Sequence, residues 1–362
     1  MESSADDTCV AILDGKRVLS NVVMKQHANH REFGGIHPAV AIEAHQRNMP
    51  RALRQALREA NMKVQEVDGI AFTRGPGMGG CLSVSVNAAQ NLAAALNKPM
   101  VGVHHMQAHA LTSQFTNPEE THGYPFLTLL ISGGHTMIVL VSSCQEFKIL
   151  ASTVDVAIGN AFDKTARMLN ISPDPGRGYG YALEKFCCSE SWMSYHRGKG
   201  STQYPFPPLA HNVPNPTQSH VFSFSGLTAA VDRVIRSNDF DEEGRRVVAC
   251  AFQDAAFAQL ELKLRGALKW CQGKGISIGS VVISGGVASN VTLRQRLDSS
   301  FKHKDRYGNS LKFVFPPPEF CTDNAAMIAW ASMYRFLGGD IDEYGIQPLP
   351  KWSIEELGKT SS

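Results

Sequence analysis

The chain has 362 residues, of which 43% are hydrophobic and 19% are charged, and its formal net charge is +2. Such a chain can bury a sizeable core in two domains or in one large two-lobed domain, which excludes intrinsic disorder. The small net charge excludes a global basic field that would attract nucleic acid, so any RNA contact has to come from a local patch.

In the first half of the chain, strand and helix patterns alternate. Apolar, β-branched runs predict strands, whereas Ala-rich or Pro-initiated runs predict helices. Strands are predicted at residues 9–13, 18–24, 69–73 and 100–103, and helices at residues 38–60 and 82–96, with a further helix from His105.

The second half repeats this alternation, which predicts two related α/β lobes with a cleft between them. Asp323 is placed at the start of the last helix, where a carboxylate is favoured. Segments rich in Gly and Pro, 176–180 and 198–216, are predicted loops. Strands are predicted at residues 126–131, 137–141, 281–283 and 312–315, and helices at 160–169, 227–236, 247–270 and 323–336.

Cysteine usage and hydropathy indicate the environment of the protein. The eight cysteines are scattered and none form Cys-x-x-Cys, which is typical of buried thiols in a reducing compartment. No apolar run reaches the ~20 residues that span a membrane, so we predict no membrane partner.

The chain starts directly with the polar run Glu2–Thr8, with no strand before it. A loop that carries catalytic groups needs support on both sides. We therefore expect that upstream sequence, including a first strand and a targeting segment, is missing before Met1.

Two histidines, His105 and His109, are four residues apart in a predicted helix. This spacing places both imidazoles on one helix face, close enough to bind one metal ion. The best third ligand is Asp323, in the other half of the chain, which predicts a metal held between two lobes and acting on a substrate. The spacing also fits two partly exposed histidines without a metal. A zinc protease is excluded, because its general-base Glu is replaced by Met106.

Three glycine loops have backbones suited to a phosphate or a nucleotide, because glycine lets amide groups approach an anion closely. They are Gly75-Pro76-Gly77, Ser132-Gly133-Gly134 and Gly285-Gly286-Val287. Each is also an ordinary turn when taken alone. The absence of a Gly-x-x-x-x-Gly-Lys-[Ser/Thr] run excludes a P-loop enzyme.

Four aspartates are further candidates: Asp6, Asp7, Asp155 and Asp163. Asp6 and Asp7 are adjacent, so their charges repel, and one of them is a candidate base or a group that polarises a nucleophile. Asp163 is followed by Lys164 on a predicted helix, a pattern more typical of a solvated helix face.

Nine short motifs follow one another along the chain. They are Glu2–Thr8, Gly34–Pro38, Arg74–Gly77, His104–Ala110, Ser132–Thr136, Ala161–Lys164, Phe222–Leu227, Ser284–Asn290 and Cys321–Asn324. With these motifs the chain resembles the tRNA N6-adenosine threonylcarbamoyltransferases, members of the superfamily of actin, the heat-shock ATPase chaperones and the sugar kinases. The first and last motifs are most similar to the mitochondrial branch.

The resemblance implies an α/β, two-lobed actin-like (ASKHA) fold with a central interlobe cleft. The N-terminal actin-like lobe is expected at residues 1–124, with a truncated first strand. A C-terminal lobe with a helical insertion is expected at residues 125–322. Residues 323–362 are expected to form a helix and tail that return towards the N-terminal lobe.

The resemblance also implies the site residues. His105, His109 and Asp323 match the metal ligands of the family, which implies one divalent ion, iron or zinc, per subunit. Asp6 matches an acidic residue essential for transfer. The positions that bind threonylcarbamoyl-AMP are matched by Leu130, Ile131, Ser132, Gly133, Gly134, Asp163 and Asn290.

One substrate-binding glycine of the family lies in a Pro-Gly-Gly-Pro loop, whereas this chain has Pro175–Tyr181 there. Counting back from Glu184 selects Gly180, and counting forward from Asp163 selects Arg177. We take Gly180 as the predicted residue.

The implied activity is that of an acyltransferase in tRNA modification. It moves a threonylcarbamoyl group from threonylcarbamoyl-AMP to N6 of adenosine 37 in tRNAs that read ANN codons, so the implied partners are tRNA and threonylcarbamoyl-AMP. Two other classes stay open: an ATP-binding chaperone-like or kinase-like module, and a non-catalytic scaffold of a tRNA-modifying complex.

Similarity to the mitochondrial branch adds two expectations. The first is a place in the mitochondrial matrix, with the targeting segment absent from this chain. The second is a homodimer that acts without partner subunits and whose contact includes apolar surface of the first lobe.

Overall fold

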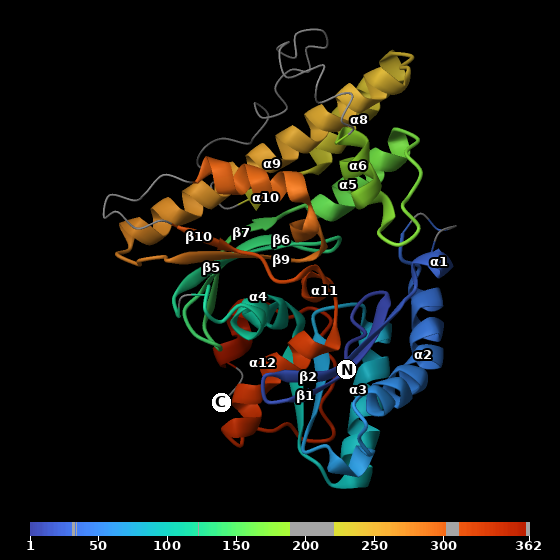
Figure 1. The fold of residues 1–362 in the computed structure, drawn as a ribbon, viewed down its shortest axis with the longest axis vertical. Coiled ribbons are helices and arrows are strands. Elements are labelled where there is room, and N and C mark those ends of the chain that lie inside the picture. Colours follow the sequence, from blue (N-terminus) through green and yellow to red (C-terminus); the bar gives the residue numbers. More distant parts are fainter. Residues whose placement is uncertain (31–32, 34, 122, 189–220, 302–310, 360–362) are drawn as a thin grey trace. The chain divides into compact units, whose positions relative to one another are not determined.

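The computed structural model describes residues 1–30, 33, 35–121, 123–188, 221–301 and 311–359 (Figure 1). The predicted loop at 198–216 lies outside the described residues. The chain forms two compact units. The first comprises Met1–Tyr124, Val141–Lys148 and Pro316–Ser362, and the second comprises Pro125–Leu140 and Ile149–Phe315.

The first unit contains strands and helices from both ends of the chain. Its elements are β1 (Asp7–Asp14), β2 (Arg17–Lys25), α1 (His27–His30), α2 (Pro38–Glu59), η2 (Val64–Glu66), β3 (Ile70–Gly75), α3 (Gly79–Leu96), β4 (Met100–His104), α4 (His105–Thr116), α11 (Pro318–Cys321), α12 (Ala325–Leu337) and η5 (Ile354–Lys359).

The start of the chain joins the strands of the first unit. β1 and β2 form an antiparallel hairpin, and β3 pairs with β4 in parallel. Between these pairs, Glu2 exchanges two 2.9 Å backbone hydrogen bonds with Cys9 of β1. On the other side, the Met1 amine donates to the carbonyl of Ala71 (2.8 Å), and the Thr73 amide donates to the carbonyl of Met1 (3.1 Å). Met1 and Glu2 therefore occupy a strand position between β1 and β3.

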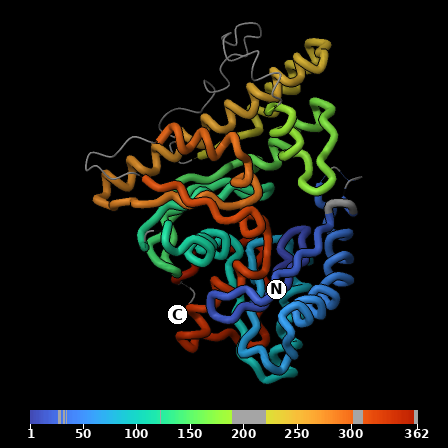
Figure 2. The backbone as a smooth tube through the Cα atoms, in the orientation of Figure 1, coloured from blue at the N-terminus to red at the C-terminus, as the bar shows by residue number. Residues whose placement is uncertain are grey.

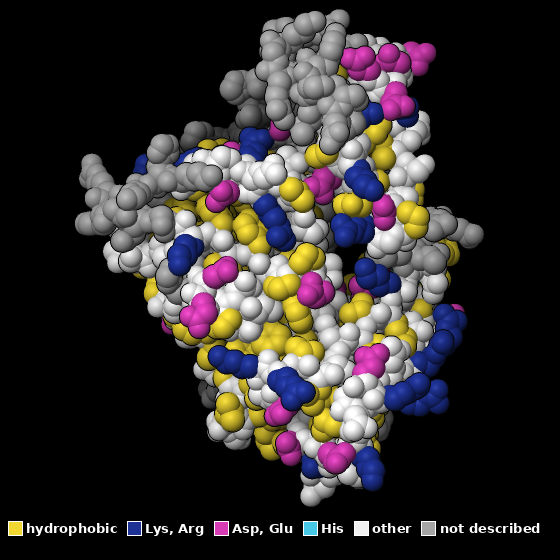
Figure 3. Space-filling view, in the orientation of Figure 1, with side chains coloured by type: hydrophobic (Ala, Val, Ile, Leu, Met, Phe, Trp, Pro, Cys, Tyr) yellow, Lys and Arg dark blue, Asp and Glu magenta, His cyan; other side chains and the backbone are white. Residues whose placement is uncertain are grey.

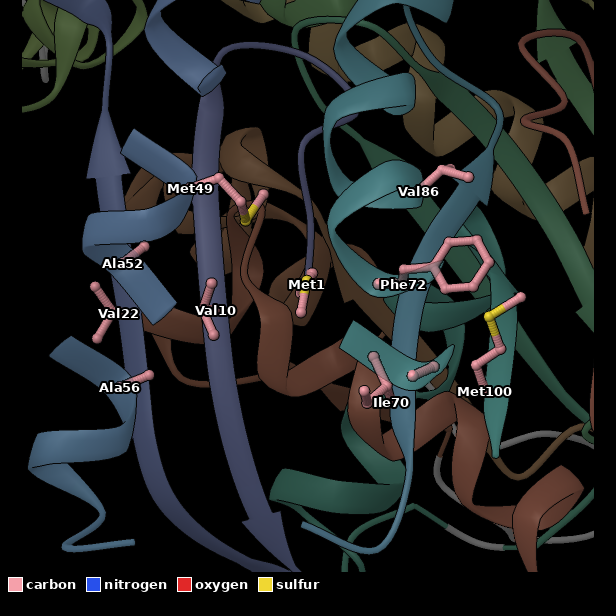
Figure 4. Packing of buried hydrophobic residues seen from close by; sticks show 12 residues of the cluster. Met1, Val10, Val22, Met49, Ala52, Ala56, Ile70, Phe72, Val86 and Met100 are labelled. Carbon is pink, nitrogen blue, oxygen red and sulfur yellow. The ribbon is translucent and has the colours of Figure 1, made fainter. Parts of the chain in front are cut away.

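The core of the first unit lies between its strands and the helices α2 and α3. Figure 4 shows Met1 between Val10 of β1 and Ile70 of β3, with the alanines of α2 packed close to Val22. On the opposite face of the strands lies α12, which packs against β1, β3, β4 and α4. Figure 2 follows the last part of the chain as it returns to these strands. The alternation of strand side chains between the two faces directs Cys9 towards the α12 side and Val10 towards α2.

The second unit is built on one six-stranded sheet with strand order β10-β9-β5-β6-β7-β8. Figure 1 shows its helices on one side of this sheet. Its elements are β5 (Phe126–Ile131), β6 (Thr136–Val141), β7 (Phe147–Thr153), α5 (Ile158–Met168), α6 (Gly178–Cys187), β8 (Val221–Phe222), α8 (Ser225–Ser237), α9 (Glu242–Gly273), β9 (Ser280–Ser284), η4 (Gly286–Ser289), α10 (Val291–Ser300) and β10 (Lys312–Val314).

The predicted α/β class with two lobes is confirmed, and most predicted elements are present with small differences at their ends. Two predictions are wrong. The segment 176–180 is not entirely a loop, because Gly178 begins α6, whose Leu183 and Cys187 are buried. Asp323 does not cap the last helix. The side chain of Asn324 accepts from the Met327 amide (3.0 Å), so α12 starts one residue later than a cap at Asp323 would allow.

Among the described residues, no helix has the length and apolar character that crossing the lipid bilayer requires.

Gly285 follows β9 in a conformation that disfavours other residues, with φ of +99°. A Cβ atom there would lie 2.3 Å from the Ile131 carbonyl oxygen at the end of β5. We expect Gly285→Ala to lower the free energy of unfolding by about 3 kcal/mol. At Gly286 a Cβ would meet nothing within 4 Å, so Gly286→Ala should leave stability nearly unchanged in urea unfolding. Equal effects of the two substitutions would contradict this account of the turn.

Candidate metal centre and substrate loops

The two histidines are positioned by the direct passage from β4 into α4. His104, the last residue of β4, caps the helix: its Nδ1 accepts hydrogen bonds from the amides of Met106 (3.1 Å) and Gln107 (3.4 Å). One turn apart on the helix, the rings of His105 and His109 lie edge to face with centroids 4.8 Å apart. Both are buried, so the alternative of two partly exposed histidines does not hold.

Asp323 completes this group from the segment between α11 and α12. Its Oδ1 lies 3.1 Å from Nε2 of His109 and 3.5 Å from Nε2 of His105. One ligand atom from each of the three residues lies within 4.8 Å of the others. The group can therefore hold one metal ion with two imidazoles and a carboxylate, a ligand set that leaves a coordination position open.

A second carboxylate, from Glu2, lies behind His105. Its Oε2 is 3.1 Å from Nδ1 of His105, and the hydroxyl of Ser4 is 3.3 Å from the same nitrogen. Glu2 is fully buried and also accepts from the Thr73 hydroxyl and the Ser4 amide. With Nδ1 engaged, Nε2 of His105 is the atom directed at Asp323. A carboxylate in this position fixes the tautomer of a metal ligand.

The charges around His105 favour a cation. Burial alone would lower the pKa of His105, but the carboxylates of Glu2 and Asp323 outweigh burial and raise its pKa to about 10. Burial likewise opposes the charged form of Asp323, yet the two histidines hold its pKa well below the usual value. The buried Nδ1 of His109 has no hydrogen-bond partner among the described residues. The buried carboxylate of Glu2 and the half-buried carboxylate of Asp323 thus favour a positive charge between them, which a bound divalent ion would supply in place of the proton.

All three candidate ligands belong to the first unit. The interpretation of a metal bridging two lobes is therefore wrong, because the chain returns to the first unit at Pro316, before Asp323. Sequence separation alone does not reveal this return.

Asp6 lies on the loop before β1, half-buried and outside the group of three ligands. Buried His45 of α2 holds this loop, with its Nδ1 2.8 Å from the Thr8 hydroxyl and its Nε2 3.0 Å from the Ala5 carbonyl oxygen. On the other side, the Met78 amide at the start of α3 donates to the Ser4 carbonyl (2.9 Å). Asp6 is thus carried by a loop that is fixed at both ends.

In the second unit, two glycine loops lie next to each other. β5 and β9 are parallel neighbours, so Ser132–Gly134 and Gly285–Val287 both follow the carboxyl ends of adjacent strands. The Gly159 amide at the start of α5 donates to the Ser132 carbonyl (3.2 Å). Ligands of α/β sheets bind at this kind of edge.

The remaining predicted substrate residues also belong to the second unit. A Cβ at Gly180 would lie 3.6 Å from Oδ1 of Asp163, so α6 and α5 bring these two residues together. Arg177 is exposed and contacts the ring of Tyr181. Asn290 caps α10, accepting from the Leu293 amide (2.9 Å). Leu130 and Ile131 are buried at the end of β5.

The third glycine loop packs against the C-terminal part of the chain. Gly75 and Gly77 belong to the first unit and pack against the Leu349–Pro350 segment, with the Gly77 amide donating to the Pro350 carbonyl (3.2 Å). These glycines allow close backbone packing within the first unit, and nucleotide binding at this loop stays a prediction.

Asp155 anchors the turn before α8. It accepts from the hydroxyls of Ser223 (2.6 Å) and Ser225 (2.5 Å) and from the amides of Phe224 and Ser225. Its role is thereby structural, and the Phe222–Leu227 motif is the segment it holds.

With this geometry established, the sequence comparisons decide the family. The family model described as tRNA N6-adenosine threonylcarbamoyltransferase matches residues 17–330. The chain belongs to this family. The resemblance inferred from the nine motifs is confirmed.

Relatives in the tRNA N6-adenosine threonylcarbamoyltransferase family cover nearly the whole chain. The chain is 36% identical to the tRNA N6-adenosine threonylcarbamoyltransferase of Rickettsia canadensis, over 99% of this chain and 98% of the relative. It is 35% identical to the mitochondrial enzyme of Schizosaccharomyces pombe, over 99% and 86%. It is also 35% identical to a probable mitochondrial enzyme of Arabidopsis thaliana, over 100% and 76%.

Among solved structures, component A of the (R)-2-hydroxyglutaryl-CoA dehydratase of Acidaminococcus fermentans aligns over 92% of this chain and 94% of its own, with 14% identity and a TM-score of 0.48.

We expect His109→Ala to reduce metal content while the fold is retained. Loss of a supporting partner of a ligand already costs about 10–100-fold in metal affinity, and loss of the ligand itself should cost more. Met106, also buried on α4, provides the control: Met106→Ala should keep the metal but lose about 2–5 kcal/mol of stability through packing. Elemental analysis and thermal unfolding measure the two effects. Full metal occupancy in His109→Ala would exclude His109 as a ligand.

The anchor at Asp155 predicts a pH-dependent stability difference. Burial would raise its pKa, but the hydrogen bonds from Ser223 and Ser225 outweigh burial and lower the pKa from 3.8 to about 2. Because the folded pKa is the lower one, the stabilisation is full above pH 4 and is lost as the pH falls through 2. We expect Asp155→Asn to cost about 1 kcal/mol at pH 7, after discounting for solvent exposure. Exposed Asp239→Asn is the control, and a cost at pH 7 that persisted unchanged at pH 2 would refute the role of the charge.

Proposed function

We propose that this protein transfers the threonylcarbamoyl group from threonylcarbamoyl-AMP to N6 of adenosine 37 in tRNAs that read ANN codons. The observation that carries the proposal is the preassembled group of His105, His109 and Asp323 in a chain whose family is named for this activity. A chaperone-like or kinase-like module has no use for such a ligand set. A non-catalytic scaffold would not need the buried support that Glu2 gives it.

The first unit would supply the metal centre. His105, His109 and Asp323 would hold a divalent ion, iron or zinc, which when bound neutralises charge on the oxygens of the donor and polarises it. Glu2 would keep Nε2 of His105 directed at the ion. Because both histidines are buried and His105 is supported by Glu2, the site would need little reorganisation on binding.

The loops of the second unit would hold the adenylate part of the donor. Ser132–Gly134 and Gly285–Val287 offer backbone amides at adjacent strand ends, where phosphate oxygens can approach closely. Asp163 is the acceptor available to ribose or adenine donors. Gly180 would keep the space next to Asp163 free of a side chain, and Asn290 would fix the start of α10.

The acceptor is an aromatic amine that must lose a proton. As N6 of adenosine bonds to the carbamoyl carbon, the bond to the phosphate oxygen breaks and AMP leaves. Asp6 would accept or orient the N6 proton, from a loop fixed by His45 and the start of α3. The anticodon loop is single-stranded, so no duplex has to be opened.

Two further features belong to the proposal. Relatives named as mitochondrial in Schizosaccharomyces pombe and Arabidopsis thaliana support a mitochondrial location for this protein, which imaging of the full gene product would test. We also propose that it works as a homodimer without other subunits. A fully active monomer in light scattering would exclude the dimer requirement.

The decisive experiment mixes the purified protein with threonylcarbamoyl-AMP and unmodified tRNA and measures the modified nucleoside by mass spectrometry. We expect product without added subunits. Asp6→Asn should lower kcat about 10²–10⁴-fold, as loss of a general base does, with metal content unchanged. Asp14→Asn, at the exposed last residue of β1 before the hairpin turn, should leave the rate unchanged. Absence of product with the metal-loaded wild-type protein would refute the proposed activity.

A further inference from the structure

Helix α2 carries four arginines on one face. Arg47, Arg51, Arg54 and Arg58 follow one another at intervals of four, three and four residues, which places them within about 60° around the helix. All four are exposed. They form a stripe about 17 Å long, at 1.5 Å per residue. Figure 3 shows Lys and Arg side chains gathered along the edge of the molecule over α2.

These arginines differ from Arg246, Arg296 and Arg335 in their charge environment. Arg246, Arg296 and Arg335 each form an ion pair with an acidic side chain. Within the parts of the chain that the structure describes, no ion pair involves the four arginines of α2. Glu43 is the acidic residue on their face, one turn before Arg47, and it limits the stripe at its N-terminal end. Glu59, beyond the last arginine, is hydrogen-bonded to Gln55.

The same helix is tied to the loop of Asp6. The opposite face of α2 is buried through Ala41, Ala44, Met49 and neighbouring residues. On this buried face His45 bonds to Ala5 and Thr8, on either side of Asp6. The stripe therefore begins two residues after the side chain that holds the candidate catalytic loop, and both lie in one compact unit.

We infer that the arginine stripe of α2 binds the phosphate backbone of the tRNA, next to the anticodon loop; this inference rests on the proposed function. Net charge is only +2, so a polyanion has to be attracted by a local patch such as this one. Over about 17 Å a nucleic-acid strand presents roughly five charges, at ~3.4 Å per charge. Arginine matches phosphate with two parallel hydrogen bonds. Four arginines over this length thus meet a comparable number of phosphate charges, and a phosphate backbone presents such a continuous row of charges by its own repeat.

The test measures binding of a labelled anticodon stem-loop RNA by fluorescence anisotropy over a range of salt concentrations. For Arg51→Gln/Arg54→Gln we expect Kd to rise about tenfold at low salt, and the slope of log Kd against log salt to fall by about two. The Arg47→Gln/Arg58→Gln variant should show the same changes in Kd and in salt slope. Agreement between the two double variants excludes a folding defect in one of them as the cause. Lys269→Gln/Lys274→Gln, exposed on and after α9, removes the same charge and should bind like the wild type.

The outcomes separate this inference from the proposed function, because RNA binding is measured without catalysis. Wild-type protein that binds RNA through the stripe but transfers no threonylcarbamoyl group would refute the function and leave the inference standing. Active wild-type protein whose stripe variants keep the RNA affinity and salt slope would overturn the inference. The inference would also be overturned if the control variant weakened binding as much as the stripe variants. If the stripe variants kept their RNA binding but lost the homodimer, the stripe would be part of a protein interface instead.

Discussion

The buried imidazole of His105, held between the carboxylates of Glu2 and Asp323, is the interaction on which the first unit depends. The carboxylate of Glu2 would be costly to bury alone, and removing one partner of a buried ion pair such as Glu2–His105 typically costs about 3–5 kcal/mol. The group can exist only if the start of the chain, α4 and the segment before α12 fold together. Charge balance therefore couples three distant stretches of sequence, and it prepares the same atoms to receive a metal ion.

At the starts of α4 and α12, one residue caps the helix and its neighbour in the sequence is a candidate metal ligand. His104 caps α4, which leaves His105 one residue further along to face the ligand group. Asn324 caps α12, which leaves the carboxylate of Asp323 available to both histidines. Had Asp323 been the cap, its oxygens would bond to helix amides instead. Helix capping thus determines which polar residue has a structural role and which one is available to bind a metal ion.

The two units contribute different chemistry. In the second unit, parallel pairing of β5 and β9 aligns two glycine loops at one sheet edge, and close packing of Gly285 on Ile131 keeps them together. In the first unit, α2 has two faces with different roles: its buried face holds the Asp6 loop through His45, and its exposed face carries four arginines that form no ion pair with another described residue. Recognition of a polyanion and support of the candidate base are thus built into one helix.

The sequence by itself determined the family, the α/β class, most strands and helices, and the candidate ligands His105, His109 and Asp323, because periodicity and short motifs are local properties. It also contained the spacing of Arg47, Arg51, Arg54 and Arg58, although only the structure shows that no acidic side chain in its described part forms an ion pair with them. Tertiary structure alone decided that Glu2 supports His105, that Asp323 lies in the same unit as the histidines, and that the backbone at Gly75 packs against Leu349. Each of these features depends on contacts between residues far apart in the chain. Burial and charge pairing determine such contacts, and a local sequence pattern contains neither.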